Sequence, residues 1–245
     1  MLLKTEALVL RTVKYGEQKL IVDLFTREQG RLSFVVPMPR SARAKVGKQL
    51  LQPLTLLFIE ADVRPQNALH RLREATLAVP LPRLLGDAGK LAIALFVAEF
   101  LYHALRGEQR DEALFDYVRT SIEWLDGARE HYANFHLVFL MRLSRFLGFF
   151  PNLEGYVPGS YFDLRQSGFT LHVPTHRDFL VPQEADHISL LMRMDFATMH
   201  LFRLSRDQRR RILEILLAYY RIHLPQMPGL RSPEVLAELF AAPVG

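Results

Sequence analysis

The chain of 245 residues contains no cysteine, and this absence excludes several kinds of chemistry. It can form no disulfide, no thiol nucleophile and no thiolate metal site. It also lacks a long uninterrupted apolar segment, because its most apolar run, residues 91–105, contains Glu99 and His103. That run is shorter than the roughly 20 residues that span a bilayer. We therefore expect a buried helix there and no contact with a membrane.

Common catalytic signatures are missing as well. The segment from Gly86 to Lys90 resembles a phosphate-binding loop, but the Walker spacing requires glycine where the chain has Leu84. The nine histidines are scattered without an H-E-x-x-H segment, and no G-x-S-x-G segment occurs. The sequence therefore indicates a binding protein and not an enzyme.

Positive charge is concentrated near the N-terminus. Residues 1–80 hold 13 Lys and Arg against 7 Asp and Glu, a net charge of +6, whereas residues 81–245 hold 18 against 19. A basic surplus on one small module is typical of proteins that bind a polyanion, although acidic protein tails remain an alternative to DNA or RNA. The opening residues MLLKTEALVL place Lys4 and Glu6 inside any signal-peptide core, so we expect a cytoplasmic protein.

The first 80 residues have the pattern of five short strands. Apolar runs at 7–14 and 19–26 flank a turn at Tyr15 to Glu17, and a third run at 31–36 alternates apolar and mixed positions. Two further runs cover 54–60 and 69–79. A five-stranded open sheet of this size would expose its edges, so we expect a closed OB-type barrel, with an SH3-like barrel as the alternative.

After Pro80 the apolar periodicity changes from about two to about 3.6 residues, which predicts helices. We expect an α+β chain of two domains, an OB-type barrel at 1–80 and a helical domain at 81–245. The expected helices cover residues 84–106, 111–124, 133–149, 183–202, 206–224 and a short stretch from Ser232. Residues 152–182 are rich in Gly, Pro, Tyr and Phe, which predicts an irregular or β-hairpin insertion.

A basic segment from Arg40 to Lys48 carries four cations and no acid in the predicted loop between strands three and four. Such a loop can contact phosphates, although a plain solvated loop is the alternative. Base stacking requires an exposed aromatic ring, and Tyr15 beside the first turn is the best candidate. Phe25, Phe34 and Phe58 fall on apolar strands and are expected in the barrel core.

A second cationic cluster surrounds Ser205 at the start of a late helix, and it could receive an acidic peptide or a phosphate. An ordinary charged helix face is the alternative. The cluster consists of Arg203, Arg206, Arg209, Arg210 and Arg211.

Several segments together resemble the RecO family of bacterial recombination mediators. They are ALVLRTVKYGE at 7–17, FTREQGRL at 25–32, RSARAK at 40–45 and LQPL at 51–54, with weaker matches in LGFFPNL at 147–153 and LRSPEVLAELF at 230–240. Their shared order over nearly the whole chain carries the resemblance.

The resemblance implies a protein that acts without ATP in DNA repair and recombination. Such a protein anneals complementary strands coated by single-strand binding protein and, with RecR, helps to load RecA at gaps in the nucleoid. It implies DNA contacts, to single strands and duplex, through the basic positions of the matched segments. These are Arg11, Lys14, Arg27, Arg31, Arg40, Arg43 and Lys45, to which the charge pattern adds Lys19 and Lys48. The family's helical domain holds the acidic tail of single-strand binding protein, for which Arg206, Arg209 and Arg210 are the candidates here.

Many members of the family carry a four-cysteine zinc module after the segment that matches 147–153. The corresponding positions here are approximately Tyr156, Gly159, His172 and Thr175, so we expect no zinc. An aromatic cluster is expected to hold the insertion together instead, formed by Tyr156, Tyr161, Phe162 and Phe169.

Two other functions remain open from sequence. One is a generic OB-type binder of single-stranded DNA or RNA without mediator activity. The other is a helical adaptor whose barrel docks a protein partner.

Overall fold

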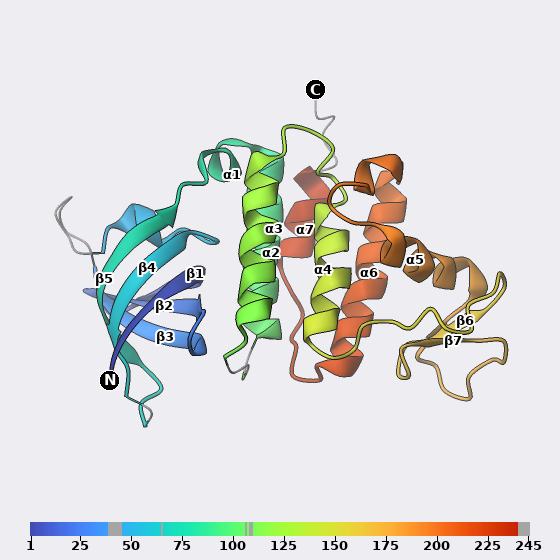
Figure 1. Ribbon diagram of the computed structural model, residues 1–245, viewed down its shortest axis with the longest axis horizontal. Helices are drawn as coiled ribbons and strands as arrows, with labels where there is room; N and C mark the ends of the chain where they lie inside the picture. Colours follow the sequence, from blue (N-terminus) through green and yellow to red (C-terminus); the bar gives the residue numbers. More distant parts are fainter. Residues whose placement is uncertain (39–45, 65, 106, 108–109, 240–245) are drawn as a thin grey trace. The chain divides into compact units, whose positions relative to one another are not determined.

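The computed structural model describes residues 1–38, 46–64, 66–105, 107 and 110–239 (Figure 1). Its N-terminal part is a closed barrel with the strand order β1-β2-β3-β5-β4, in which only the β3–β5 pair is parallel among the described strands. The strands are β1 (Leu2–Tyr15), β2 (Lys19–Thr26), β3 (Gly30–Pro37), β4 (Leu56–Asp62) and β5 (His70–Val79). The predicted OB-type barrel is confirmed.

Alternate residues of each strand face the barrel interior and are apolar. On β2, for example, Leu20, Val22 and Leu24 are buried in the core, and the other four strands contribute Val9, Phe34, Val36, Ile59 and Leu72. A short 3-10 helix, η1 (Lys48–Leu51), adds Leu51 to this core. Because the interior is filled by one set of side chains, the other set is left for the outer surface.

Helices cover part of the outer barrel surface. These are α1 (Pro82–Gly86), α2 (Ala88–Ala104) and α3 (Glu112–Gly127), and α7 (Ser232–Leu239) packs on α2. Phe25 points outward from β2, is fully buried, and its ring centroid lies 5.4 Å from that of Phe115 on α3. Helix α2 contacts β1, α1 and α7, so it is apolar on most of its surface. The barrel and these helices form one compact unit, Met1–Gly127 with Leu230–Leu239.

Glu99 on α2 holds the start of α7. Its carboxylate accepts hydrogen bonds from the backbone N–H groups of Arg231 at 3.0 Å and Ser232 at 2.8 Å, and from the Ser232 hydroxyl. Burial acts to raise the pKa of Glu99, but the hydrogen bonds from Ser232 and Arg231 hold it below its ordinary value. Glu99 therefore caps a helix that lies 132 residues further along the chain.

Glu99→Ala should loosen α7 without unfolding the barrel. Loss of hydrogen bonds to a charged acceptor costs about 1–3 kcal/mol, which corresponds to amide exchange in α7 faster by about 5- to 150-fold. Hydrogen exchange with mass spectrometry measures this. Glu112→Ala removes an exposed carboxylate of α3 and serves as the control; equal exchange in α7 of both variants would contradict the role of Glu99.

The second compact unit spans Ala128–Gly229 among the described residues. It contains α4 (Phe135–Phe146), α5 (Pro182–Arg193), a 3-10 turn η2 (Met199–Leu201) and α6 (Arg206–His223). Ser205 and Gln208 form a capping box at the start of α6. Helix α4 packs against α5 and α6, and the buried Tyr220 of α6 donates a hydrogen bond to the carbonyl of Leu140 at 2.7 Å.

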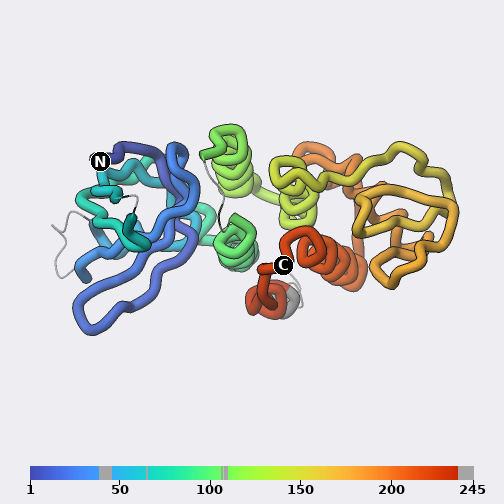
Figure 2. Tube along the Cα trace, turned by 90° about the horizontal axis from the view of Figure 1, so that it is seen from below, coloured from blue at the N-terminus to red at the C-terminus, as the bar shows by residue number. Residues whose placement is uncertain are grey.

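Residues 152–182 form a lobe with a small sheet of β6 (Tyr161–Asp163), β7 (Gly168–Thr170) and β8 (Phe179–Leu180). Figure 2 shows this segment, in gold, folded upon itself; it follows α4 and precedes α5 in the chain. Phe169 contacts Tyr156 and Phe162, with ring centroids 4.8 and 4.9 Å apart, whereas Tyr161 contacts Phe179. Three of the four expected aromatic residues therefore form one cluster.

Helix α6 anchors this lobe. The buried Tyr219 hydroxyl donates its one hydrogen to the Phe149 carbonyl, and its oxygen accepts a hydrogen bond from the Ser167 hydroxyl at 2.6 Å. His223 Nε2 donates to the Leu164 carbonyl at 2.8 Å, and its ring stacks on Phe149. Burial raises the pKa of Tyr219 to about 12, so it is a permanent donor. These contacts, missed by the sequence analysis, hold the lobe to α6.

Two expected helices are interrupted. The stretch 84–106 is divided because Asp87 caps α2, its side chain accepting the Lys90 N–H at 3.0 Å. The stretch 183–202 is divided after Arg193, where Met194 is extended and Asp195 accepts the Thr198 N–H at 2.6 Å. In both cases an aspartate side chain competes for backbone donors that a continuous helix would use.

The chain changes from strands to helices near residue 81, where β5 ends at Val79 and α1 begins at Pro82. That this point is also the limit between two domains stays a prediction. No helix among the described residues is both long and apolar enough to span a membrane.

Candidate nucleic-acid interface

The outer surface of β1, β2 and β3 has an uncovered end, which we term the hairpin face. The strand register aligns Val13, Ile21 and Val35 in one row and Tyr15, Lys19 and Pro37 in the next. These side chains alternate with the inward Leu20, Val22 and Val36, so they point outward together. Tyr15 is 53% exposed and Val13 is 36% exposed. The face thus offers an aromatic ring and aliphatic surface beside a cation.

Three lysines surround this end of the barrel. Lys14 and Lys19 lie beside the β1–β2 turn, and Lys48 begins η1, which packs against β1 through a 2.9 Å hydrogen bond from Thr12 to the Leu51 carbonyl. All three are exposed, and no described carboxylate lies within ion-pair distance of their ammonium groups. Their charge is therefore available to a bound anion.

The basic segment between β3 and η1 starts at this same end. Met38 donates its N–H to the Gln18 carbonyl of the β1–β2 turn at 2.8 Å, and Val46 is buried in the barrel core. Arg40, Arg43 and Lys45 lie outside the described residues. Met38, which precedes this segment in the chain, is hydrogen-bonded to the β1–β2 turn, so the segment begins beside the hairpin face.

Three other expected DNA contacts are engaged within the protein. Arg11 donates to the buried Asp23 at 2.9 Å, and its guanidinium lies 4.0 Å from the ring centroid of Tyr102 on α2. Arg31 packs on the same ring and donates to the Tyr102 carbonyl. Both arginines therefore connect the barrel to α2.

Arg27 belongs to a chain of ion pairs between the barrel and α3. Its Nε donates to Glu6 at 3.0 Å and its Nη1 to Asp116 at 3.2 Å. Arg119 donates to the other oxygen of Glu6 at 2.6 Å and to Glu123 at 2.8 Å. The hydrogen bond to Asp116 holds the pKa of Arg27 above its ordinary value despite partial burial. A structural role accounts for Arg27 without any phosphate.

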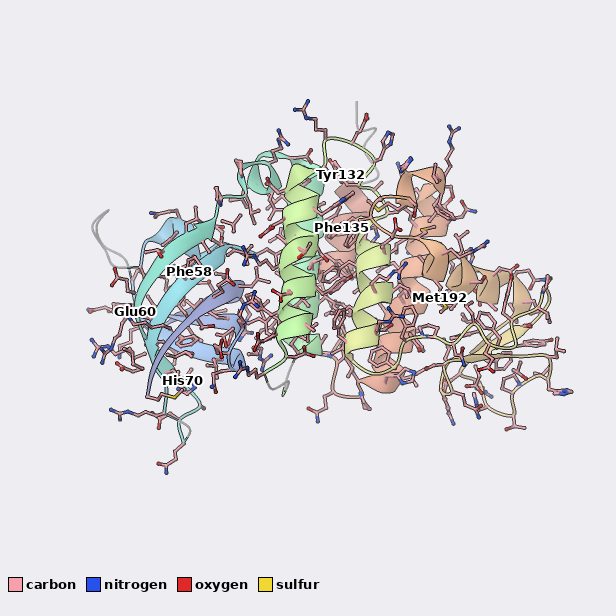
Figure 3. All side chains as sticks on the ribbon, viewed as in Figure 1. Phe58, Glu60, His70, Tyr132, Phe135 and Met192 are labelled. Carbon is pink, nitrogen blue, oxygen red and sulfur yellow. The ribbon has the colours of Figure 1, made fainter. Side chains whose placement is uncertain are left out.

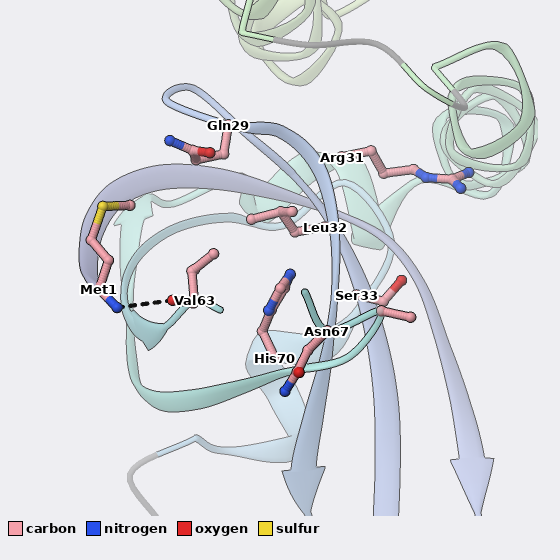
Figure 4. A pocket seen from close by; sticks show the side chains of 9 residues that line it. Met1, Gln29, Arg31, Leu32, Ser33, Val63, Asn67 and His70 are labelled. Carbon is pink, nitrogen blue, oxygen red and sulfur yellow. Dashed lines mark hydrogen bonds between the residues drawn. The ribbon is translucent and has the colours of Figure 1, made fainter. Parts of the chain in front are cut away.

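A polar hollow of about 440 Å³ opens at one end of the barrel (Figure 4). His70 reaches between Leu32, Val63 and Asn67, and burial lowers its pKa, so it is neutral at pH 7. Its Nδ1 faces the Arg64 N–H at 3.4 Å, which leaves Nε2 as the proton-bearing nitrogen. Arg31 and the N-terminal ammonium group, which donates to the Val63 carbonyl at 2.9 Å, add positive charge to the lining of this hollow.

Exposed Arg64 and Arg71 flank the β4–β5 connection and were not selected from sequence. OB-type barrels use this connection together with the β1–β2 turn for oligonucleotide binding. The position of Arg64 and Arg71 beside it could therefore have identified them from the sequence as candidate DNA contacts.

The late arginine cluster does not converge on one point. Arg209 is half-buried and donates to the Leu204 carbonyl at 2.6 Å, whereas Arg210 pairs with Glu214 and Arg211 with Glu184. Burial and the nearby Arg206 lower the pKa of Arg209. Arg206 is exposed on the first turn of α6.

The positions that correspond to the zinc module do not fit a metal. Tyr156 donates to Asp186 at 3.1 Å, and His172 is exposed. Among the parts of the chain that the structure describes, no three His, Asp or Glu side chains are grouped to hold a metal ion.

Comparison with known proteins agrees with the barrel and helical parts. Residues 1–80 match the family model of the Recombination protein O N terminal, and residues 85–233 match that of the C terminal. Proteins named DNA repair protein RecO from Phocaeicola vulgatus and Bacteroides fragilis are 50% and 49% identical over 241 residues, which is 98% of this chain and 100% of each relative. That from Porphyromonas gingivalis is 39% identical over 245 residues. The chain therefore belongs to the RecO family of DNA repair proteins.

Proposed function

We propose that this protein is a non-enzymatic recombination mediator that acts in the bacterial cytoplasm without ATP or zinc. It binds single-stranded DNA, anneals complementary strands coated by single-strand binding protein and, with RecR, helps to load RecA at gaps. The main support is the hairpin face, where Tyr15 lies among three lysines that have no described acidic partner.

Single strands bind when bases stack on an aromatic ring and phosphates meet nearby cations. Tyr15 and Lys19 are cross-strand neighbours, and Lys14 precedes Tyr15. One nucleotide stacked on Tyr15 would therefore place a flanking phosphate near the Lys19 ammonium group, whereas Lys14, the register partner of the inward Leu20, points to the other side of the hairpin. The hairpin face, extended by Lys48 and the segment with Arg40, Arg43 and Lys45, is the proposed DNA path. Arg11 lies next to this face, whereas Arg27 and Arg31 lie near the β2–β3 turn at the other end of the strands; all three position the barrel on the helices.

Annealing follows from the same charge. Cations that neutralise one phosphate backbone reduce its repulsion of a second strand, and base pairing then drives the reaction. Release of the strand from its coat requires contact with single-strand binding protein. We propose that its acidic tail binds at the α6 arginines, with Arg206 and Arg210 at the surface and Arg209 behind them.

The test is annealing of two complementary oligonucleotides coated with the cognate single-strand binding protein. We expect this protein to accelerate annealing at least tenfold, and excess free acidic-tail peptide to abolish the acceleration. Arg206→Ala with Arg210→Ala should weaken the peptide effect, whereas Arg177→Ala with Arg221→Ala, an equal charge loss elsewhere in the same unit, should not.

The outcomes separate the proposal from its alternatives. Binding to bare strands without accelerated annealing of coated strands would contradict mediation and identify a generic OB-type binder. Absence of both DNA binding and accelerated annealing would identify a helical adaptor whose barrel docks a protein partner.

A further inference from the structure

The barrel has a second exposed surface on β1, β4 and β5, and its centre is Phe58. The prediction that Phe58 lies in the barrel core is wrong, because its side chain points outward and is 52% exposed. Figure 3 labels Phe58 and Glu60, both on β4. We term this surface the Phe58 face, formed by Lys4, Glu6, Phe58, Glu60, Glu74 and Thr76, which line a hollow of about 470 Å³.

The Phe58 face is acidic although the chain as a whole is basic. Three carboxylates line the hollow against one ammonium group, that of Lys4, which is paired with Glu60. Glu6 is engaged by Arg27 and Arg119. For Glu74, no described cation lies within ion-pair distance. A phosphate backbone would be repelled here, so the surface is unsuited to DNA.

The fold places two like charges opposite each other on this face. Glu60 and Glu74 are direct cross-strand partners, and the neighbouring pair is Phe58 with Thr76. Like charges at directly opposed positions destabilise a sheet. A half-exposed phenylalanine ring also forgoes the stabilisation that full burial of its apolar surface would give. Lys4 already pairs with Glu60, so the Glu74 carboxylate and the exposed Phe58 ring are the groups that a bound cation with an apolar neighbour would satisfy.

We propose that the Phe58 face docks a partner protein through an arginine that lies beside an apolar residue. A guanidinium stacks on an aromatic ring and also pairs with a carboxylate in a two-pronged contact, which an ammonium cannot do. Phe58 supplies the ring, Glu74 the carboxylate, and the hollow receives the apolar neighbour. A central aromatic residue surrounded by polar groups is the usual composition of an interface hot spot.

A second copy of the chain is a poorer occupant on geometric grounds. Its cationic surface is the hairpin face, so docking would join unlike surfaces head to tail into a ring or an open filament and would cover the hairpin face of each copy. A partner protein leaves the hairpin face free, and DNA and the partner can then bind the same barrel together.

The test uses the isotope-labelled full chain and two synthetic peptides. One is acetyl-Gly-Leu-Arg-Gly-Leu-Arg-Gly-amide, and the other has citrulline in place of both arginines. We expect the arginine peptide to shift the NMR amide signals of residues 58–60 and 74–76 and the citrulline peptide to bind at least fivefold more weakly. Phe58→Ala and Glu74→Gln should each weaken the arginine peptide at least fivefold. Tyr15→Ala, which removes an equally exposed ring from the hairpin face, should have no effect.

A stability measurement separates a docking site from a structural one. Glu74→Lys ends the repulsion with Glu60, so it should raise the melting temperature by about 1–3 °C while abolishing peptide binding. Equal binding of the citrulline peptide, or unchanged binding by Phe58→Ala, would overturn the proposal. So would a fall in melting temperature, or self-association in sedimentation that Phe58→Ala abolishes, because the occupant would then be a second copy.

Discussion

Replacing Tyr15 and Lys19 together with alanine lowers the affinity for a single-stranded oligonucleotide by about 100-fold, or ~2.7 kcal/mol. Stacking of one base on an aromatic ring contributes about 1–3 kcal/mol, and one phosphate contact adds about 1 kcal/mol at moderate salt. Both side chains are exposed on the hairpin face, so folding should be unaffected. Fluorescence anisotropy with a labelled oligonucleotide measures the Kd.

The barrel offers a matched control for this variant. Phe58 is a ring of nearly equal exposure, 52% against 53% for Tyr15, and Lys4 is an exposed lysine on the same face as Phe58. Phe58→Ala with Lys4→Ala should leave the Kd for DNA unchanged. If both double variants lose affinity equally, the loss is not local and the hairpin face is not the binding surface.

Salt dependence gives a second readout of the same surface. If about four cations meet phosphates, the logarithm of affinity should fall with the logarithm of salt concentration at a slope of about −3. Lys14→Ala with Lys19→Ala should reduce the slope to about −1.5. A slope near zero in the unmodified protein would exclude phosphate contacts as the main source of affinity.

Lowering the pH from 7 to 4.5 should destabilise the second unit through His136 by about 2–3 kcal/mol. His136 on α4 is 3% exposed, and burial, followed by the charge of Arg209, lowers its pKa to about 3. The unfolded chain binds a proton near pH 6.5, whereas the folded chain does not. Stability is therefore lost as pH falls below 6.5, by about 1.4 kcal/mol per pH unit, until the folded pKa is reached.

His136→Gln removes the titrating group and retains hydrogen-bonding capacity, so its stability should fall less between pH 7 and 4.5 than that of the unmodified protein. Urea denaturation at both pH values measures the difference. His172→Gln, at an exposed position, should lose stability like the unmodified protein. Equal losses in all three would show that other groups control the acid response.

The sequence predicted the barrel well because strand burial is local information. In β2, the alternation of Leu20, Val22 and Leu24 with outward residues is visible without any partner strand. The position of Phe58 was mispredicted because β4 carries apolar residues on consecutive positions, so the alternation gives no single inward set there.

The location of the candidate site was predictable from the sequence. Which of the expected DNA-binding cations form ion pairs within the protein was not. Lys14, Tyr15 and Lys19 are adjacent to one turn, so their proximity follows from the hairpin itself. The partners of Arg27 lie 21 residues before it and 89 residues after it, and only the folded chain brings these charges together. Long-range ion pairs leave no periodic signal in a sequence.

The lobe at 152–182, anchored by Tyr219 and His223, contains neither cysteine nor methionine. Thiolates and thioethers are the side chains that peroxide oxidises most readily, and a thiolate-bound metal is lost when its ligands are oxidised. Peroxide at concentrations that oxidise thiolates and thioethers would therefore leave the side chains of this lobe of a repair protein unmodified.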